Sequence, residues 1–323
     1  MRCLTLAEAM IDAGWNCRFA IGPETLKAVH RLTEYEAECI HLSEDLWSEP
    51  EQMASGLDHV TCDVLVVDHY QRGIEFERAC RVWARRILVI DDLTERQHDA
   101  DFLLNQNLGS HADDYNGIVT DGCHLLIGPQ YALLKPHFEA LRQQSLERRR
   151  KQEGVERILV SYGMSDTQSL TLMTLEALKR IGFTGHVDAV IGGGSSSLAD
   201  VHAIAAAMGS QVRVLSAVED MATLMSNADL AIGAGGTTSW ERCAMGLPAV
   251  VVVVADNQTS ASDALAQAGA IRVAGDAAIE LSQLQKEIRA TLIDFESLQL
   301  TSARAANICD GGGRMRVLEA LHA

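Results

Sequence analysis

Several features that indicate membrane, secreted or zinc-binding proteins are absent from this sequence. Its eight cysteines form no CxxC pair and are scattered through apolar segments, which argues against a disulfide framework or a zinc site and favours reduced, buried thiols. The longest apolar run, Pro248–Ala255, is too short to span a bilayer and fits a strand covered on both faces. We therefore expect a cytoplasmic protein with reduced cysteines.

Positive charge is also scarce. Lys and Arg number 27 against 44 Asp and Glu, which gives a formal net charge of −17 at pH 7. This balance argues against non-specific binding to nucleic acid and against stable association with an anionic membrane surface. The basic run Glu147–Lys151 is then better explained as a solvated connector, and any anionic ligand must be held by local donors.

Strand-like apolar runs alternate with helical segments along most of the chain, a pattern typical of parallel α/β layers. With 323 residues and 47% hydrophobic content, the chain favours two cores of ordinary domain size. We predict one Rossmann-like domain over residues 1–150 and a second over 151–323. The expected strands are Cys62–Asp68, Arg86–Ile90, Asp101–Leu104 and His124–Ile127 in the first half, then Arg157–Ser161, Val187–Ile191, Val212–Leu215, Asp229–Ile232 and Pro248–Val254.

The first residues depart from the usual start of such a domain. Cys3–Ala13 has helical spacing, and Gly14 suits the end of a helix before a strand at Asn16–Ala20. A doubly wound domain normally begins with a central strand, and the loop after that strand binds ligands. We expect this strand and loop to be missing here; the alternative is a variant domain that begins with a helix.

The most informative segment is the glycine loop, Gly233–Thr238, together with Glu241. It follows the apolar run Asp229–Ile232 and precedes a predicted helix over Ser239–Met245. Glycines and free N–H groups at a helix start suit a diphosphate, and Glu241, one turn into the helix, suits two vicinal hydroxyls such as those of ribose. The alternative is a plain strand-to-helix turn with packing glycines.

Several motifs, in order along the chain, resemble one enzyme family, the UDP-2,4-diacetamido-2,4,6-trideoxy-β-L-altropyranose hydrolases of the pseudaminic acid pathway. The resemblance extends to about residue 270. The glycine loop and the later glutamine are also similar to the glycosyltransferase that completes lipid II, which implies a GT-B fold of two lobes with an interlobe cleft and a last helix that returns to the first lobe. The motifs are Arg2–Ala7, Asp68–Tyr70, Asp91–Asp92, Leu103–Asn107, Gly128–Leu134, the glycine loop and Ala255–Gln258.

The resemblance implies a role for each matching residue on the UDP side. The glycine loop would hold the diphosphate, Glu241 the ribose, and the backbone at Val218 the uracil edge. Ser165 and Asp166 would lie near the phosphates or the sugar, although Met164 replaces the second glycine of the family's usual pair. The loop residues assigned to the diphosphate are Ala234, Gly235, Gly236, Thr237 and Thr238.

On the sugar side, the resemblance implies that Tyr70 and Asn257 act at the reacting sugar and that Gln258 begins the next helix at the cleft rim. The alternatives are an aromatic wedge for Tyr70 and a turn residue for Asn257. The family's water-activating histidine lies in a Gly-x-Gly-His-x-x-Arg loop, which by alignment to Arg2 falls before Met1. His69 and His98 are the nearest substitutes, and both are better explained as structural or solvated.

We expect a UDP-sugar hydrolase that releases UDP by metal-independent attack of water at the anomeric carbon, with inversion. Asp91–Asp92 resembles a metal motif superficially but fits a strand-end cap, so neither metal nor other cofactor is implied. The alternatives are a GT-B glycosyltransferase that uses a UDP-sugar, and a UDP-sugar-binding protein with impaired catalysis. The missing histidine leads us to expect that Met1 is internal to a longer reading frame, or that the chain is a defective copy.

Overall fold

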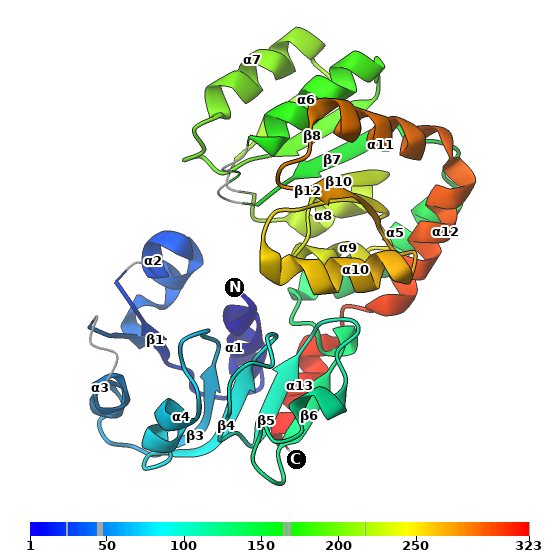
Figure 1. The fold of residues 1–323 in the computed structure, drawn as a ribbon. Coiled ribbons are helices and arrows are strands. Elements are labelled where there is room, and N and C mark those ends of the chain that lie inside the picture. The colour runs from blue at the N-terminus through cyan, green and yellow to red at the C-terminus, as the bar shows by residue number, and fades with distance from the viewer. Residues whose placement is uncertain (24, 44–47, 164–165, 167–168, 217, 323) are drawn as a thin grey trace. The chain divides into compact units, whose positions relative to one another are not determined.

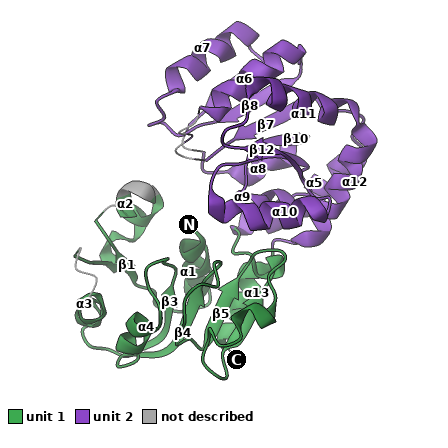
Figure 2. Cartoon of the chain, viewed as in Figure 1, with its two compact units in different colours: residues 1–134, 312–323 green, residues 135–311 purple. Residues whose placement is uncertain are grey.

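The computed structural model describes residues 1–323 except 24, 44–47, 164–165, 167–168, 217 and 323 (Figure 1). The chain forms two compact units, residues 1–134 with 312–323 and residues 135–311 (Figure 2). Among the described residues, no helix is both long and apolar enough to cross a membrane.

The break between the units lies before helix α5 (Pro136–Arg150), not after residue 150 as the polar run in the sequence suggested. The reason is the buried Arg149, whose guanidinium donates to the carbonyl oxygens of Met225, Ala228 and Met245. These contacts make α5 part of the second unit. The polar run suggested that Arg149 is solvated, but in the fold its side chain binds three backbone carbonyl groups of that unit.

The first unit contains a parallel sheet of order β3-β4-β5-β6 and a separate parallel pair, β1-β2. On the central strand β4, Leu88 and Ile90 face one hydrophobic cluster, while Ile87 and Val89 face another. Burial on both sides explains why these strands are continuous apolar runs in the sequence. The strands are β1 (Phe19–Ile21), β2 (Cys39–His41), β3 (Cys62–Val67), β4 (Ala84–Ile90), β5 (Phe102–Asn105) and β6 (His124–Ile127).

Helices cover both faces of this first sheet. As predicted, the chain begins with a helix, α1, followed by Gly14 at φ +89°. The last helix, α13, packs beside α1, where Val317 and Leu321 share a cluster with Leu6 and Met10. The helices are α1 (Arg2–Asp12), α2 (Thr25–Ala28), α3 (Glu49–Gly56), α4 (Ile74–Cys80) and α13 (Gly313–His322), with 3-10 turns η1 (His30–Glu38), η2 (Ala112–Tyr115) and η3 (Pro129–Tyr131).

The second unit is a six-stranded parallel sheet of order β12-β11-β10-β7-β8-β9. The chain enters at β7, adds β8 and β9 on one side, and then returns to place β10 on the other. The strand order therefore reverses between β7 and β10. The strands are β7 (Arg157–Ser161), β8 (His186–Val190), β9 (Val212–Leu215), β10 (Leu230–Ala234), β11 (Ala249–Val253) and β12 (Arg272–Asp276).

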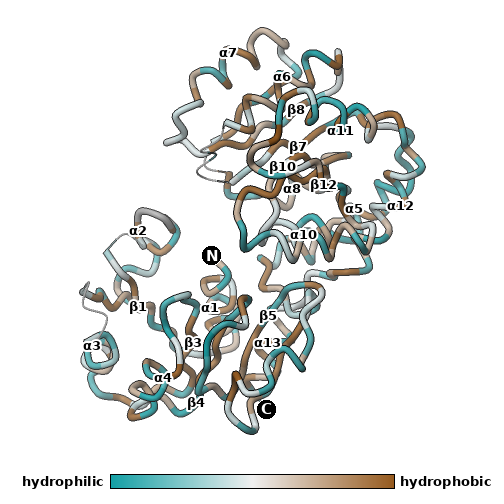
Figure 3. The backbone as a smooth tube through the Cα atoms, in the orientation of Figure 1, coloured by the Kyte–Doolittle hydropathy of each residue, from teal (hydrophilic) through white to brown (hydrophobic). Residues whose placement is uncertain are grey.

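Two layers of helices enclose the second sheet (Figure 1). One layer packs on a core that includes Ile158, Val160 and Ile232. The strands form the hydrophobic centre of the unit (Figure 3). That layer consists of α6 (Leu170–Ile181), α7 (Leu198–Met208) and α11 (Leu281–Ile293). The other consists of α5, α8 (Met221–Asn227), α9 (Thr238–Ala244), α10 (Thr259–Gln267) and α12 (Phe295–Ile308), with η4 (Asp256–Gln258) before α10.

Candidate functional site

The glycine loop lies at the point where the strand order of the second sheet reverses. Strand β10 ends at Ala234 and continues into the loop, and Gly233 pairs with Ser161, the last residue of β7. Open α/β sheets bind ligands outside the carboxyl ends of their strands at such a reversal. The segment that the sequence selects for a diphosphate therefore lies where this architecture favours a ligand.

A side chain at any of three positions of the loop would be crowded or strained. A Cβ on Gly233 would overlap the carbonyl oxygen of Ser161, and a Cβ on Gly235 would lie 2.7 Å from the hydroxyl of Ser262. Gly236 adopts φ +100°, a conformation that costs L residues free energy. The backbone path therefore explains Gly233 and Gly236, and neighbouring side chains favour glycine at Gly235.

The start of α9 offers hydrogen-bond donors. Thr237 is the N-cap residue, and no side chain caps this helix end. Within the described parts of the chain, no acceptor is found for the N–H groups of Gly236, Thr237 and Thr238. Together with the two threonine hydroxyls, these groups suit the oxygens of an anion.

Gln258 reaches the same loop from the next strand-to-helix connection. Its Oε1 accepts from the N–H of Val254 at 3.2 Å, and its side chain lies against Gly235 and Gly236. The sequence did not indicate Ser262, one turn along α10, whose buried hydroxyl has no partner among the described residues. Its spacing of four residues from Gln258 is the signal that would have identified it.

Glu241 is a half-buried carboxylate without a hydrogen-bond partner. It lies one turn into α9, and no hydrogen bond or ion pair reaches its oxygens from any residue that the structure describes. Burial raises its pKa to about 7, although the positive charges of Arg242 and Lys135 act in the opposite direction. A carboxylate that is removed from water and left unpaired is typical of a ligand-binding position.

Two further predicted residues lie on loops of this unit. Asn257 is exposed in η4 next to Gln258. Val218 is half-buried in the loop between β9 and α8, and the carbonyl of its neighbour Glu219 accepts from Lys135 Nζ at 3.3 Å. The positive charge of Lys135 also acts electrostatically on Glu241. The roles assigned to Asn257 and Val218 stay predictions.

Ser165 lies outside the described residues. Asp166 is buried, and its two carboxylate oxygens accept from the N–H groups of Leu170 at 2.9 Å and Thr171 at 3.1 Å. These bonds satisfy the free backbone donors at the start of α6. Asp166 therefore shapes the loop after β7 as a helix cap, and its direct contact with a ligand stays a prediction.

In the first unit, Tyr70 lies in the turn that follows β3. Its side chain is 49% exposed, so it is not a buried wedge between strand and helix. The neighbouring His69 accepts at Nδ1 from the N–H of Gln71 at 3.0 Å, and burial lowers its pKa. The catalytic role of Tyr70 stays a prediction.

His98 is a buried structural residue. Its side chain is completely buried, with Nδ1 2.6 Å from Glu77 Oε1 and Nε2 3.9 Å from Asp91 Oδ1. Burial lowers its pKa, but the two carboxylates outweigh burial and raise it to about 9. His98 is therefore protonated at neutral pH and enclosed, which makes it unsuitable as a base that takes a proton from water.

This arrangement predicts a pH-dependent stability. The folded-state pKa of His98 is above its ordinary value of 6.5, so its contribution is complete below pH 6.5 and is lost as the pH rises through about 9. We expect the free energy of unfolding to fall by on the order of 2–3 kcal/mol across this window in the wild type, and by less in His98→Gln. Urea unfolding of both proteins between pH 6 and 10 tests this, and parallel curves would contradict it.

The acidic residues that end β3 and β4 are held by arginines. Arg2 donates to both carboxylate oxygens of Asp68, at 2.7 and 2.9 Å, and lies 3.7 Å from Asp92. Burial raises the pKa of Asp68, but the bonds from Arg2 lower it overall. Asp91 accepts from the N–H of Thr94 at 3.1 Å, which gives it the strand-end capping role expected from the sequence. Among the described residues, no group of three or more His, Cys, Asp or Glu is placed to hold a metal ion.

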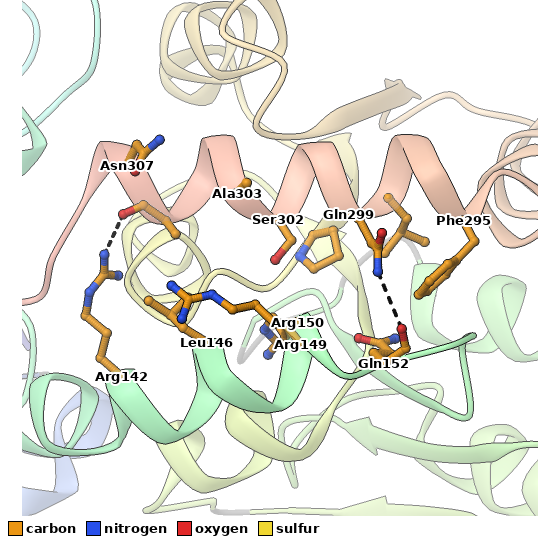
Figure 4. A pocket seen from close by; sticks show the side chains of 13 residues that line it. Arg142, Leu146, Arg149, Arg150, Gln152, Phe295, Gln299, Ser302, Ala303 and Asn307 are labelled. Carbon is orange, nitrogen blue, oxygen red and sulfur yellow. Dashed lines mark hydrogen bonds between the residues drawn. The ribbon is translucent and has the colours of Figure 1, made fainter.

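A separate pocket of about 540 Å³ lies between α5 and α12 (Figure 4). Arg142 donates there to the carbonyl oxygens of Ala244, Ala306 and Cys309, which close α9 and α12. The pocket is also lined by Pro248, just before β11, so it lies at the opposite edge of the sheet from the glycine loop. Because the arginine caps helix ends, we assign this pocket a structural role.

Comparisons with known proteins agree with this architecture. The chain is 25% identical over 180 residues to the UDP-2,4-diacetamido-2,4,6-trideoxy-beta-L-altropyranose hydrolase of Campylobacter jejuni, covering 55% of this chain and 60% of that protein. It is 30% identical over 145 residues to the spore coat polysaccharide biosynthesis protein SpsG of Bacillus subtilis, covering 44% and 41%. The chain thus spans about half the length of these curated relatives.

The fold is shared with solved structures at low sequence identity. The crystal structure of MurG from Acinetobacter baumannii matches with a TM-score of 0.70 and 15% identity, over 99% of this chain and 95% of that one. The chain has the GT-B fold that the sequence predicts. Residues 139–309 match the family model of the glycosyltransferase family 28 C-terminal domain. On this match, which covers more than half of the sequence, the chain belongs to the glycosyltransferase family 28 C-terminal domain family.

Proposed function

We propose that this protein binds UDP-2,4-diacetamido-2,4,6-trideoxy-β-L-altropyranose and hydrolyses it to UDP and the free sugar, as a cytoplasmic step of pseudaminic acid biosynthesis. The observation that supports UDP binding best is the half-buried Glu241, one turn beyond the glycine loop, whose carboxylate has no hydrogen-bond partner among the residues that the structure describes. Hydrolysis is supported by the motifs of the sequence and by the similarity to the Campylobacter protein.

In this proposal the second unit binds the leaving group. The N–H groups of Gly236, Thr237 and Thr238 donate to the diphosphate, and the Glu241 carboxylate accepts from the two ribose hydroxyls. Water attacks the anomeric carbon while the bond to the β-phosphate oxygen breaks; the electron pair of that bond leaves with UDP, and the attacking water loses its proton to the solvent. Donors fixed at the phosphate offset the negative charge that develops on this oxygen.

The sugar side is assigned to Tyr70 and Asn257. Tyr70 is exposed after β3 and Asn257 is exposed in η4, so both side chains are accessible to a ligand. An exposed phenol and an exposed amide suit contacts with the sugar's hydroxyl and acetamido groups. His98 has no part in the proton transfer, because it is buried and charged.

A second candidate function is transfer of the sugar to an acceptor other than water. It is favoured by the match of residues 139–309 to a domain of a glycosyltransferase family. Both functions use the same UDP half of the site. They differ only in the group that attacks the anomeric carbon.

The test is release of UDP from the diacetamido-trideoxy-altrose nucleotide, measured with and without candidate acceptor sugars. Release in water alone supports hydrolysis, and release only with an acceptor supports transfer. UDP binding without release under either condition would leave a UDP-sugar-binding protein and would contradict both enzymatic proposals.

The unusual pKa of Glu241 predicts a pH-dependent preference for ribose. Burial raises this pKa to about 7, so the carboxylate becomes protonated as the pH falls from 8 to 6 and accepts hydroxyl hydrogen bonds less well. We expect the preference for UDP over 2′-deoxy-UDP to fall several-fold over this range. Both ligands carry the same diphosphate, so its own titration cancels in the ratio. A ratio that does not change with pH would contradict the prediction.

A further inference from the structure

Arg242 lies in the interior directly beneath the glycine loop. Its side chain is 2% exposed, and its NH2 group donates to the carbonyl oxygen of Ala234 and to the hydroxyl of Ser239, both at 2.9 Å. A Cβ on Gly233 would lie 3.6 Å from its NH1 group. The guanidinium is therefore packed against the backbone at the end of β10, where the strand order reverses.

No carboxylate forms an ion pair with this guanidinium among the residues that the structure describes, although the charge of the adjacent Glu241 acts on it electrostatically. Its Nε has no hydrogen-bond partner, and it makes no ion pair in the described parts of the chain. The adjacent Glu241 is not bonded to it. Burial lowers the pKa of Arg242, but a guanidinium keeps its charge at neutral pH.

Three more exposed arginines of the same unit have acidic partners, whereas the buried Arg149 donates only to carbonyl oxygens. Arg148 pairs with Asp229, and Arg157 and Arg213 both pair with Asp188. A buried charge without an ion pair destabilises a fold. What distinguishes Arg242 from Arg149 is its position beneath a loop suited to an anion.

We propose that Arg242 is a positioning residue for the diphosphate. Its hydrogen bond to the Ala234 carbonyl oxygen offsets the partial negative charge of that oxygen, which would otherwise repel phosphate. The guanidinium also adds positive charge beneath the loop. The bound diphosphate then places negative charge close to this guanidinium. This inference rests on the proposed binding of UDP at the glycine loop. It states that Arg242 makes the site prefer nucleoside diphosphates to nucleosides.

The test measures the affinities of uridine, UMP and UDP for the full chain and for Arg242→Gln, by calorimetry or by competition. The glutamine keeps a donor for the Ala234 carbonyl but removes the charge. We expect UDP affinity to fall roughly tenfold or more, UMP affinity to fall less, and uridine affinity to stay within about twofold. Arg242→Lys, which keeps the charge, should recover part of the UDP affinity.

Arg149→Gln is the matched control. Arg149 is also buried, and it also donates to carbonyl oxygens without an acidic hydrogen-bond partner among the described residues, but these carbonyls lie at the other edge of the sheet. Its loss should lower stability and leave the ratios of the three affinities unchanged.

Equal losses for uridine and UDP in Arg242→Gln, or no loss, would overturn the proposal. If Arg242→Gln does not fold, Arg242→Lys decides: a retained preference for UDP over uridine supports the role of charge, and a lost preference with intact uridine binding overturns it. Failure of the wild type to bind UDP at all would instead reject the proposed function, so the two failures are distinguishable.

Discussion

Replacing Glu241 by Ala should weaken UDP binding by about 1–3 kcal/mol, which corresponds to about 5- to 150-fold in Kd. The carboxylate is half-buried and unpaired in the described structure, so two ribose hydroxyls would supply the hydrogen bonds that it lacks. Hydrogen bonds to a charged acceptor are stronger than neutral ones, and the variant loses both. Calorimetric titration of UDP into the two proteins measures the difference.

The control for Glu241→Ala is the ligand 2′-deoxy-UDP. The wild type should prefer UDP to 2′-deoxy-UDP, and the variant should bind both with similar affinity. In Glu241→Gln, which keeps an acceptor but loses the charge, the preference for UDP should lie between those of the wild type and Glu241→Ala. An unchanged UDP affinity in Glu241→Ala would remove the ribose assignment and, with it, the main support for a UDP site.

Adding one methyl group to the glycine loop should have an effect of similar size. In Gly235→Ala the new Cβ would lie 2.7 Å from Ser262 Oγ and 3.2 Å from Gln258 Oε1, so the loop or its neighbours must move. Overpacking of this kind costs about 1–3 kcal/mol. Because the displaced backbone carries the proposed phosphate donors, we expect UDP affinity to fall by about tenfold or more in the same titration.

A second substitution separates this steric effect from other causes. Ser262→Ala removes the hydroxyl that Gly235→Ala would meet, so the double variant should recover most of the lost UDP affinity. Gly154→Ala is the matched control, since a Cβ there meets no atom within 4 Å and the backbone has no positive φ. Failure of the double variant to recover, with the fold intact by circular dichroism, would show that the Gly235 surface itself contacts the ligand or that the clash is not the cause.

Most strands of the two larger sheets could be predicted, because parallel strands buried on both faces are continuous apolar runs in the sequence. Leu230–Ala234 and Ala249–Val253 are such strands, and the sequence located both to within a few residues. Strand β12 (Arg272–Asp276) was not predicted. The glycine loop was predictable for a related reason. A backbone path on which a Cβ would overlap another backbone segment, as at Gly233, can be followed only by glycine.

The sequence could not place the break between the units, because that depends on contacts between distant residues. Arg149 looks solvated in a polar run, yet it is buried against carbonyl groups more than 70 residues away. Ser262 was missed because only its spacing of four residues from Gln258 marks it in the sequence, and its contact with Gly235 depends on the fold.

By itself, the sequence determined the class of fold, the alternation of its elements and the segment to which a diphosphate is assigned. These features depend on local periodicity and on the stereochemistry of glycine, which can be read from neighbouring residues. Only the tertiary structure decided the environment of each charged group. Glu241 is left without a partner, His98 is enclosed between two carboxylates, and Arg242 is buried without an acid among the described residues. The burial and the partners of these side chains depend on which segments the strand order of the folded sheets brings together.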